Sequence, residues 1–205
     1  MKVIIDTDFL NHILKAKNGI NTMKTIVDFF GFELVMHTWV YDREVKGISS
    51  DIQKFVDNNV AIVQYKDFLI DEDDWLLYDF EFNALFEEMN HRKASLGKQS
   101  FDTYNKSGEN LGEIHSVILS RFTGIPILLS DDYNAKEIAA KRLNSQGFFL
   151  NVKKSFELLC EIISEDENKI CLDDAISVVR NYKKEYQKDC IREIKSIYKE
   201  KESEN

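Results

Sequence analysis

Cysteine is scarce in this sequence. Its three cysteines, Cys160, Cys171 and Cys190, are odd in number and widely spaced, so they form no zinc-binding pattern and favour a reducing, cytoplasmic setting. No run approaches the roughly 18 apolar residues of a membrane helix, and the N-terminus lacks the basic and then apolar layout of a signal peptide. The sequence also lacks a glycine-rich phosphate loop, a dinucleotide fingerprint and a serine-nucleophile elbow. These absences predict a cytoplasmic protein with no membrane partner.

Positive charge is also in short supply. The 205 residues carry 27 basic against 36 acidic side chains, a net charge of -9, which argues against a broad surface that coats nucleic acid. It does not exclude a nuclease, because a cluster of metal-binding carboxylates itself contributes negative charge. The length of 205 residues suits one domain with a sizeable core and a helical extension. The hydrophobic content of 43% predicts a soluble, globular protein.

Two short apolar runs, at residues 3–5 and 127–129, each end in acidic side chains. Such runs are typical of strands buried on both faces, which indicates a parallel sheet and an α/β fold. In open α/β sheets, ligands bind outside the carboxyl ends of the strands. The polar residues at these two strand ends are Asp6, Asp8, Ser130, Asp131 and Asp132. Asp8 has an alternative interpretation as a helix cap or first-turn residue.

Two further acids complete a candidate site. Glu44 follows on a predicted helix, and Glu113 opens a helix in the Gly-Glu pair at residues 112–113. If these acids converge with those of the strand ends, their mutual repulsion raises at least one pKa unless a cation joins them. Oxygen-only ligands suit Mg²⁺ or Mn²⁺, which would support hydrolysis of a phosphodiester. His12, His37 and His115 are interpreted as structural.

Two segments differ in charge from the rest of the chain. Residues 67–110 are predicted to form an acidic helical insert and a loop. The acidic side chains of the insert form either a solvated face or a surface for a basic partner. Residues 173–201 are predicted to form one long helix. From Arg180 to Lys201 this helix carries eight basic and four acidic side chains, which fits either a solvated face with ion pairs or a contact strip for phosphates or for an acidic partner.

The order of these motifs resembles the PIN domain, a family of metal-dependent ribonucleases common among prokaryotic toxins. The resemblance is to the branch with a Gly-Glu motif, and it covers residues 1–152, with residues 153–205 as a C-terminal helical extension. It implies a three-layer α/β/α sandwich with a mainly parallel sheet, Mg²⁺ or Mn²⁺ as cofactor, and cleavage of RNA that leaves a 5′ phosphate.

The resemblance also assigns roles by position. It implies an RNA substrate, an antitoxin protein if the chain acts as a toxin, and no membrane; a homodimer is a further expectation. Ser130 and Asp8 would support the site, although Asp8 stands where the family often has Asn or Ser. The implied catalytic residues are Asp6, Glu44, Glu113 and Asp132, and the implied metal ligands are Asp6, Glu113, Asp131 and Asp132.

Two other functions fit parts of the pattern. A phosphatase of the haloacid dehalogenase type would use Asp6 as nucleophile and Asp8 as acid/base, with the late acidic pair on Mg²⁺. This alternative leaves Glu113 without a role, and Leu10 stands where a hydroxyl residue or valine is usual. The second alternative is a PIN-like fold that binds a partner without turnover.

Overall fold

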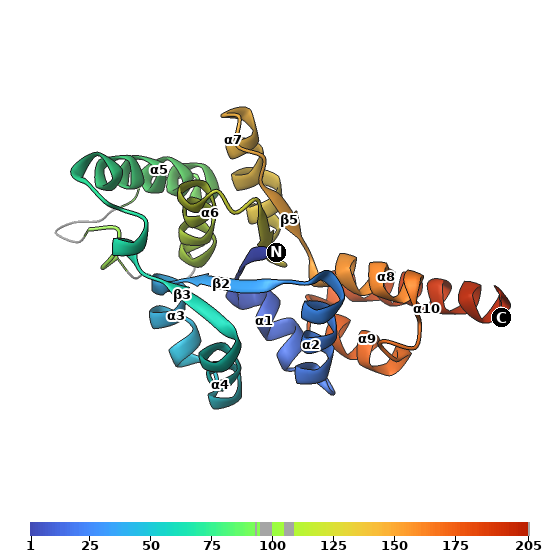
Figure 1. Cartoon of the computed structure of the whole chain (residues 1–205). Coiled ribbons are helices and arrows are strands. Elements are labelled where there is room, and N and C mark those ends of the chain that lie inside the picture. The colour runs from blue at the N-terminus through green and yellow to red at the C-terminus, as the bar shows by residue number, and fades with distance from the viewer. Residues whose placement is uncertain (93, 95–99, 105–108, 205) are drawn as a thin grey trace.

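The computed structural model describes residues 1–92, 94, 100–104 and 109–204. Five short strands in these residues form one parallel sheet in the order β3-β2-β1-β4-β5 (Figure 1). The strands are β1 (Lys2–Ile5), β2 (Glu33–His37), β3 (Val60–Val63), β4 (Ile127–Leu129) and β5 (Asn151–Lys153). The predicted α/β class with a parallel sheet is confirmed. Most of the loop predicted within residues 67–110 lies outside the described residues.

Both predicted strand–acid runs lie at the centre of this sheet. β1 pairs with β2 on one side and with β4 on the other, and Ile5 is opposite Leu129. The side chains of Val3, Ile4 and Ile5 are fully buried, because helices cover both faces of the sheet. The continuous apolar composition of β1 therefore follows from its central position.

Helices form the two outer layers of the three-layer sandwich (Figure 1). On one face, helices pack around α1, and on the other they pack around α6. The first group is α1 (Thr7–Leu14), α2 (Gly19–Phe30), α4 (Ser50–Asn59), α8 (Ser155–Glu165) and α9 (Leu172–Val179). The second group is α5 (Glu72–Asn90), α6 (Leu111–Thr123), the π-helical turn η3 (Ala135–Ala139) and α7 (Ala140–Ser145). Shorter connections are α3 (Thr38–Arg43), η1 (Val45–Gly47) and η2 (Tyr65–Asp67).

The acidic segment forms a single helix, α5, of 19 residues. Its N-terminus is capped by Asp71, whose side chain accepts a hydrogen bond from the Asp74 backbone at 3.0 Å. Tyr78 and Phe82 are fully buried, whereas Leu76 and Phe80 are each 63% exposed. The outer face of α5 is therefore partly apolar as well as acidic.

The predicted single helix over residues 173–201 is wrong, because the chain turns between α9 and α10 (Lys184–Glu204). Gln187 stabilises this turn by donating to the backbone oxygens of Arg180 at 3.1 Å and Tyr182 at 2.7 Å. The Asn181 side chain also donates to the His12 backbone oxygen at 2.8 Å. The turn brings α10 back across α8 and α9. None of the helices in the described part of the chain is long and apolar enough to cross a bilayer.

Candidate metal centre

Asp6 follows the last residue of β1 and lies against the end of β4. Its backbone N–H donates to the Leu129 oxygen at 3.0 Å, which extends the ladder between the two strands by one bond. Both oxygens of its carboxylate accept hydrogen bonds, Oδ1 from the Thr7 backbone at 2.7 Å and Oδ2 from the Ser130 hydroxyl at 3.1 Å. The predicted supporting role of Ser130 therefore has a geometric basis, because its hydroxyl fixes the orientation of the buried Asp6 carboxylate.

Three carboxylates from separate parts of the chain meet at this edge of the sheet. Asp8, Glu113 and Asp132 each contribute one oxygen to a group whose atoms all lie within 4.8 Å of one another. Glu113 is in the first turn of α6, where the helix dipole favours a negative charge. The Asp132 Oδ1 accepts from the backbone of Asn134 at 2.5 Å and of Ala135 at 3.2 Å, so the start of the next helix holds this carboxylate in place.

Glu44 lies next to the three-acid group and contacts one residue from each of two sequence motifs, Asp-Thr-Asp and the Gly-Glu pair. It lies at the end of α3, and its Oε2 accepts a hydrogen bond from the Thr7 hydroxyl at 2.5 Å. Its carboxylate also lies against Gly112, where a Cβ atom would be 2.6 Å from Oε1 and 2.7 Å from Oε2. The glycine of the Gly-Glu pair thus provides the space that the Glu44 carboxylate occupies.

The electrostatics are those of crowded acids. Burial raises the pKa of Glu113 to about 8, with further contributions from Asp132, Glu44 and Asp8. Burial is also the main cause of the raised pKa of Asp6, and the charges of Glu113, Glu44 and Asp8 add to it. The pKa values of Glu44 and Asp8 are raised as well, again mainly by removal of water from the carboxylate. A cation would relieve this repulsion.

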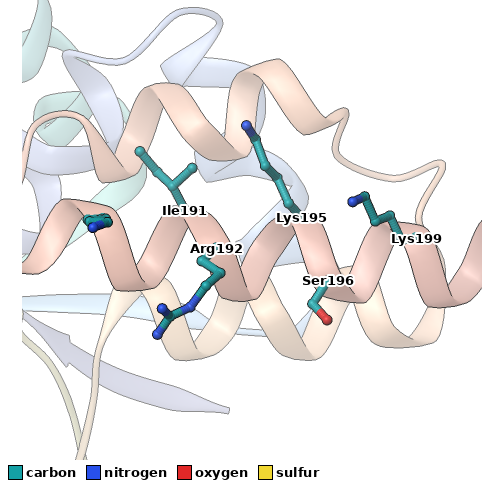
Figure 2. Close-up of a pocket in the computed structure, with 6 residues that line it drawn as sticks. Ile191, Arg192, Lys195, Ser196 and Lys199 are labelled. Atoms are coloured by element: carbon teal, nitrogen blue, oxygen red, sulfur yellow. The ribbon is translucent and has the colours of Figure 1, made fainter.

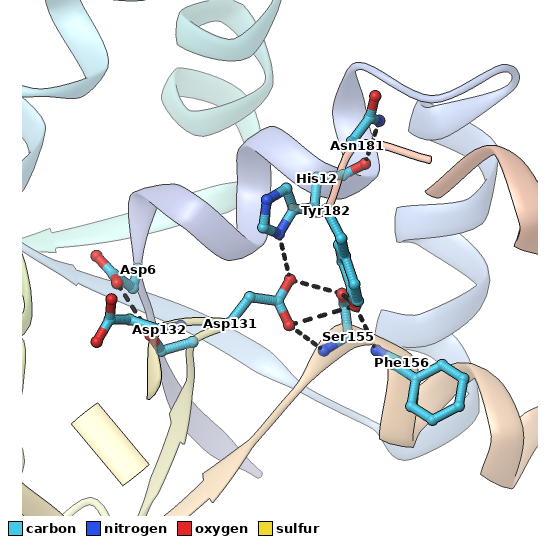
Figure 3. Close-up of polar contacts among 9 residues, drawn as sticks. Asp6, His12, Asp131, Asp132, Ser155, Phe156, Asn181 and Tyr182 are labelled. Carbon is cyan, nitrogen blue, oxygen red and sulfur yellow. Dashed lines mark hydrogen bonds and ion pairs between the residues drawn. The ribbon is translucent and has the colours of Figure 1, made fainter. Parts of the chain in front are cut away.

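Asp131 has a different environment from its neighbour Asp132. Its Oδ2 contacts His12 Nδ1 at 2.8 Å and accepts from the Ser155 hydroxyl at 2.6 Å, while Oδ1 accepts from the Ser155 backbone at 2.8 Å and from the Tyr182 hydroxyl at 3.4 Å (Figure 3). These contacts tie α1, the start of α8 and the turn before α10 together. The structure therefore does not bring Asp131 into the cluster as the predicted metal ligand, and Asp132 takes that position.

The histidines behind the site form a buried network with an aromatic residue. The Tyr78 hydroxyl lies 3.2 Å from His37 Nε2 and 2.6 Å from His115 Nδ1. Burial lowers the pKa of His37 to about 3 and that of His115 well below its ordinary value. Both rings are therefore neutral at physiological pH and belong to the packing, as the sequence interpretation expects.

The donor set fits a hard divalent cation. Every side chain in the cluster is a carboxylate, and oxygen donors of this kind are the ligands that Mg²⁺ and Mn²⁺ prefer. The sequence analysis named Asp6, Glu44, Glu113 and Asp132 as catalytic residues and gave Asp8 a supporting role, whereas the structure places Asp8 in the three-acid group. It made no prediction about the contacts of Thr7. The threonine lies between the two acids of Asp-Thr-Asp, so its position was a usable signal.

Comparisons with family models, with curated proteins and with solved structures found no match.

Proposed function

We propose that the protein is a metal-dependent nuclease. Within that class, the proposal is a PIN-type endoribonuclease that hydrolyses RNA phosphodiester bonds with Mg²⁺ or Mn²⁺. The observation that supports it best is the approach of the Asp8, Glu113 and Asp132 carboxylates to within 4.8 Å of one another, next to the buried Asp6. Acids placed so close together in a partly desolvated site are costly unless a cation or protons neutralise them.

The residues around the site have distinct proposed roles. Asp8, Glu113 and Asp132 would hold the cation, and the buried Asp6 would lie beside them with its carboxylate oriented by Thr7 and Ser130. A bound Mg²⁺ or Mn²⁺ supplies a water of lowered pKa and neutralises charge on the phosphodiester. Because the pKa of Glu113 is about 8, this carboxyl holds a proton at neutral pH, and it would give up that proton to serve as a ligand for a cation.

Glu44 has a positioned carboxylate on the same edge of the sheet. The Thr7 hydroxyl fixes its Oε2, and Gly112 leaves the space beside it. Its raised pKa suits a group that accepts or returns a proton during hydrolysis. The Ser130 hydroxyl orients Asp6 in the same way that Thr7 orients Glu44.

The surroundings of Asp6 favour a nuclease over the phosphatase alternative. A phosphatase of that type requires Asp6 as an exposed nucleophile, but its side chain is 1% exposed and both oxygens accept hydrogen bonds from the chain. Glu44 and Glu113, which have no role in the phosphatase, lie against this group. A role as a toxin, an antitoxin as partner and a homodimer stay predictions.

The test is an activity comparison with and without Mn²⁺ on single-stranded RNA, single-stranded DNA and a chromogenic phosphomonoester. We expect Mn²⁺-dependent cleavage of RNA, reduced to background by Asp6→Asn and by Glu113→Gln. Glu87→Gln is the matched control, because this acid is exposed on α5. Circular dichroism would verify folding of all three variants. Undiminished cleavage by both site variants, or turnover of the phosphomonoester alone, would remove the proposal.

A further inference from the structure

Helix α10 carries a strongly basic face. An open hollow of about 370 Å³ runs along it, lined by Lys188, Ile191, Arg192, Lys195, Ser196 and Lys199 (Figure 2). Four of these six residues are cationic and none is acidic. Arg192 forms an exposed ion pair with Asp189 at 3.0 Å, whereas the three lysines form no ion pair with any residue that the structure describes. We refer to Lys188, Arg192, Lys195 and Lys199 as the basic strip.

The strip is extended and regular. Its members recur at intervals of three and four residues, so they share one side of the helix. From Lys188 to Lys199 the strip spans about 16 Å at the α-helical rise of roughly 1.5 Å per residue. In a chain with a net charge of -9, a row of four cations, three of them without an ion pair among the described residues, is complementary to a linear polyanion rather than to a single small anion.

The turn before α10 is bonded to a residue next to the acidic cluster. Tyr182, in that turn, contacts Asp131, the residue next to Asp132 (Figure 3). The Phe156 backbone donates to the Tyr182 hydroxyl at 2.9 Å, which fixes the turn against α8. Lys183 directly follows Tyr182 in this turn. The contacts of Asp131 thus place the start of α10 at the edge of the candidate metal centre.

A second cation and an exposed ring lie near the ends of the paired strands β4 and β5. Tyr133 directly follows Asp132 and is 62% exposed. The Lys154 ammonium lies 6.0 Å from the centroid of its ring. Exposed aromatic rings next to cations are the surfaces on which unpaired bases stack. An exposed ring beside a cation therefore favours a nucleic acid over an acidic protein as the partner.

We propose that the basic strip, together with Lys183 and Lys154, binds the phosphate backbone of the RNA strand on one side of the cleavage position. This inference rests on the proposed ribonuclease function and specifies its substrate as an RNA strand that continues several nucleotides beyond the scissile bond. The contacts are to phosphates, so they supply affinity and register but no reading of base sequence. Helix α10 is then part of the substrate-binding surface.

The binding test uses the full chain in EDTA, where no cleavage occurs, and a fluorescent 20-nucleotide single-stranded RNA. The variant Lys188→Gln/Lys195→Gln/Lys199→Gln removes three charges from the strip. The matched control, Lys2→Gln/Lys24→Gln/Lys54→Gln, removes three charges from exposed lysines elsewhere. We expect the strip variant to bind at least about 10-fold more weakly, and its slope of log affinity against log salt to fall by about 2, since each single-strand phosphate contact contributes about 0.7. The control should stay within about 2-fold of the unmodified protein.

A cleavage assay separates this proposal from the proposed function. With Mn²⁺, the strip variant should raise KM for the 20-nucleotide RNA but cleave a 4-nucleotide RNA as the unmodified protein does. Equal losses of RNA affinity in the strip and control variants, or unchanged RNA affinity in both, would refute the strip as an RNA-binding surface. An acidic protein would then be the expected partner of the strip. Strip-dependent RNA binding by a protein that cleaves nothing would instead overturn the ribonuclease alone. Melting temperatures confirm that the glutamine variants fold, and the single variant Lys195→Gln repeats the test if the triple does not.

Discussion

Replacing Gly112 by alanine should impair the candidate metal centre without unfolding the protein. The added Cβ would lie 2.6 Å from the Glu44 Oε1, whereas non-bonded atoms settle at about 3.4 Å or more. The Glu44 carboxylate must therefore withdraw by about 0.8 Å, away from the position in which the Thr7 hydroxyl holds it. Gly112 is the second residue of α6 and has no left-handed backbone angle, so the backbone itself accepts alanine.

The size of the effect follows from two opposing contributions. Alanine in a helix favours folding by up to about 1 kcal/mol relative to glycine. A weakened charge-assisted bond between Thr7 and Glu44 costs about 1.5–3 kcal/mol if it is lost entirely. We therefore expect stability to change by no more than about 2 kcal/mol. Misplacement of a reacting group by about 1 Å can reduce a rate by roughly 100-fold, so we expect a loss of that order in Mn²⁺-dependent RNA cleavage.

A double-mutant comparison gives the decisive assay. Gly112→Ala, Glu44→Ala and the double variant are compared for RNA cleavage and for stability in urea. If Gly112 acts only by making space for Glu44, then Gly112→Ala has no further effect on cleavage in the Glu44→Ala background. Equal losses from Gly112→Ala in both backgrounds would refute this reasoning, as would full activity of the single variant.

Two other predictions concern pH and the paired aspartates. The pKa of Glu113 is about 8 in the folded protein against an ordinary 4.5, so its contribution to stability is fully present below about pH 4.5 and is lost as the pH rises through 8. Thermal melts in EDTA should therefore show the unmodified protein losing stability relative to Glu113→Gln between pH 5 and 8.5, and a constant difference would contradict the assignment. Asp131→Asn should lower stability by about 2–4 kcal/mol, since Asp131 accepts from Ser155 and contacts His12 and Tyr182. Asp132→Asn should instead abolish the Mn²⁺-induced rise in melting temperature, and the reverse pattern would exchange the two roles.

The fold could be predicted because its central strands have a simple local signature. The runs at residues 3–5 and 127–129 are apolar throughout and end in acids, and the structure makes them the neighbouring strands β1 and β4. Asp6 follows the first run directly and Asp132 lies three residues after the second, so the pairing of these strands brings both acids to one edge. Glu113 could be placed beside them because the Gly-Glu pair opens a helix.

The remaining features depend on contacts that local pattern does not encode. Asp131 and Asp132 are adjacent and chemically identical, and their different roles follow from Ser155 and Tyr182, which lie 24 and 51 positions along the chain from Asp131. The turn between α9 and α10 has no proline or glycine to mark it. Its stabilising bonds come from the Gln187 and Asn181 side chains, and the Asn181 bond reaches a partner in α1.

The central place of β1 has a consequence for the time at which the site forms during synthesis. β1 leaves the ribosome before the other four strands, yet its neighbour β4 follows roughly 120 residues later, and closing a loop of that length is a slow, entropically opposed step. Asp6 therefore has no acidic neighbour from α6 or β4 for most of translation. If the protein is the proposed ribonuclease, the nascent chain would be unable to cleave the messenger RNA that encodes it until β4 pairs with β1.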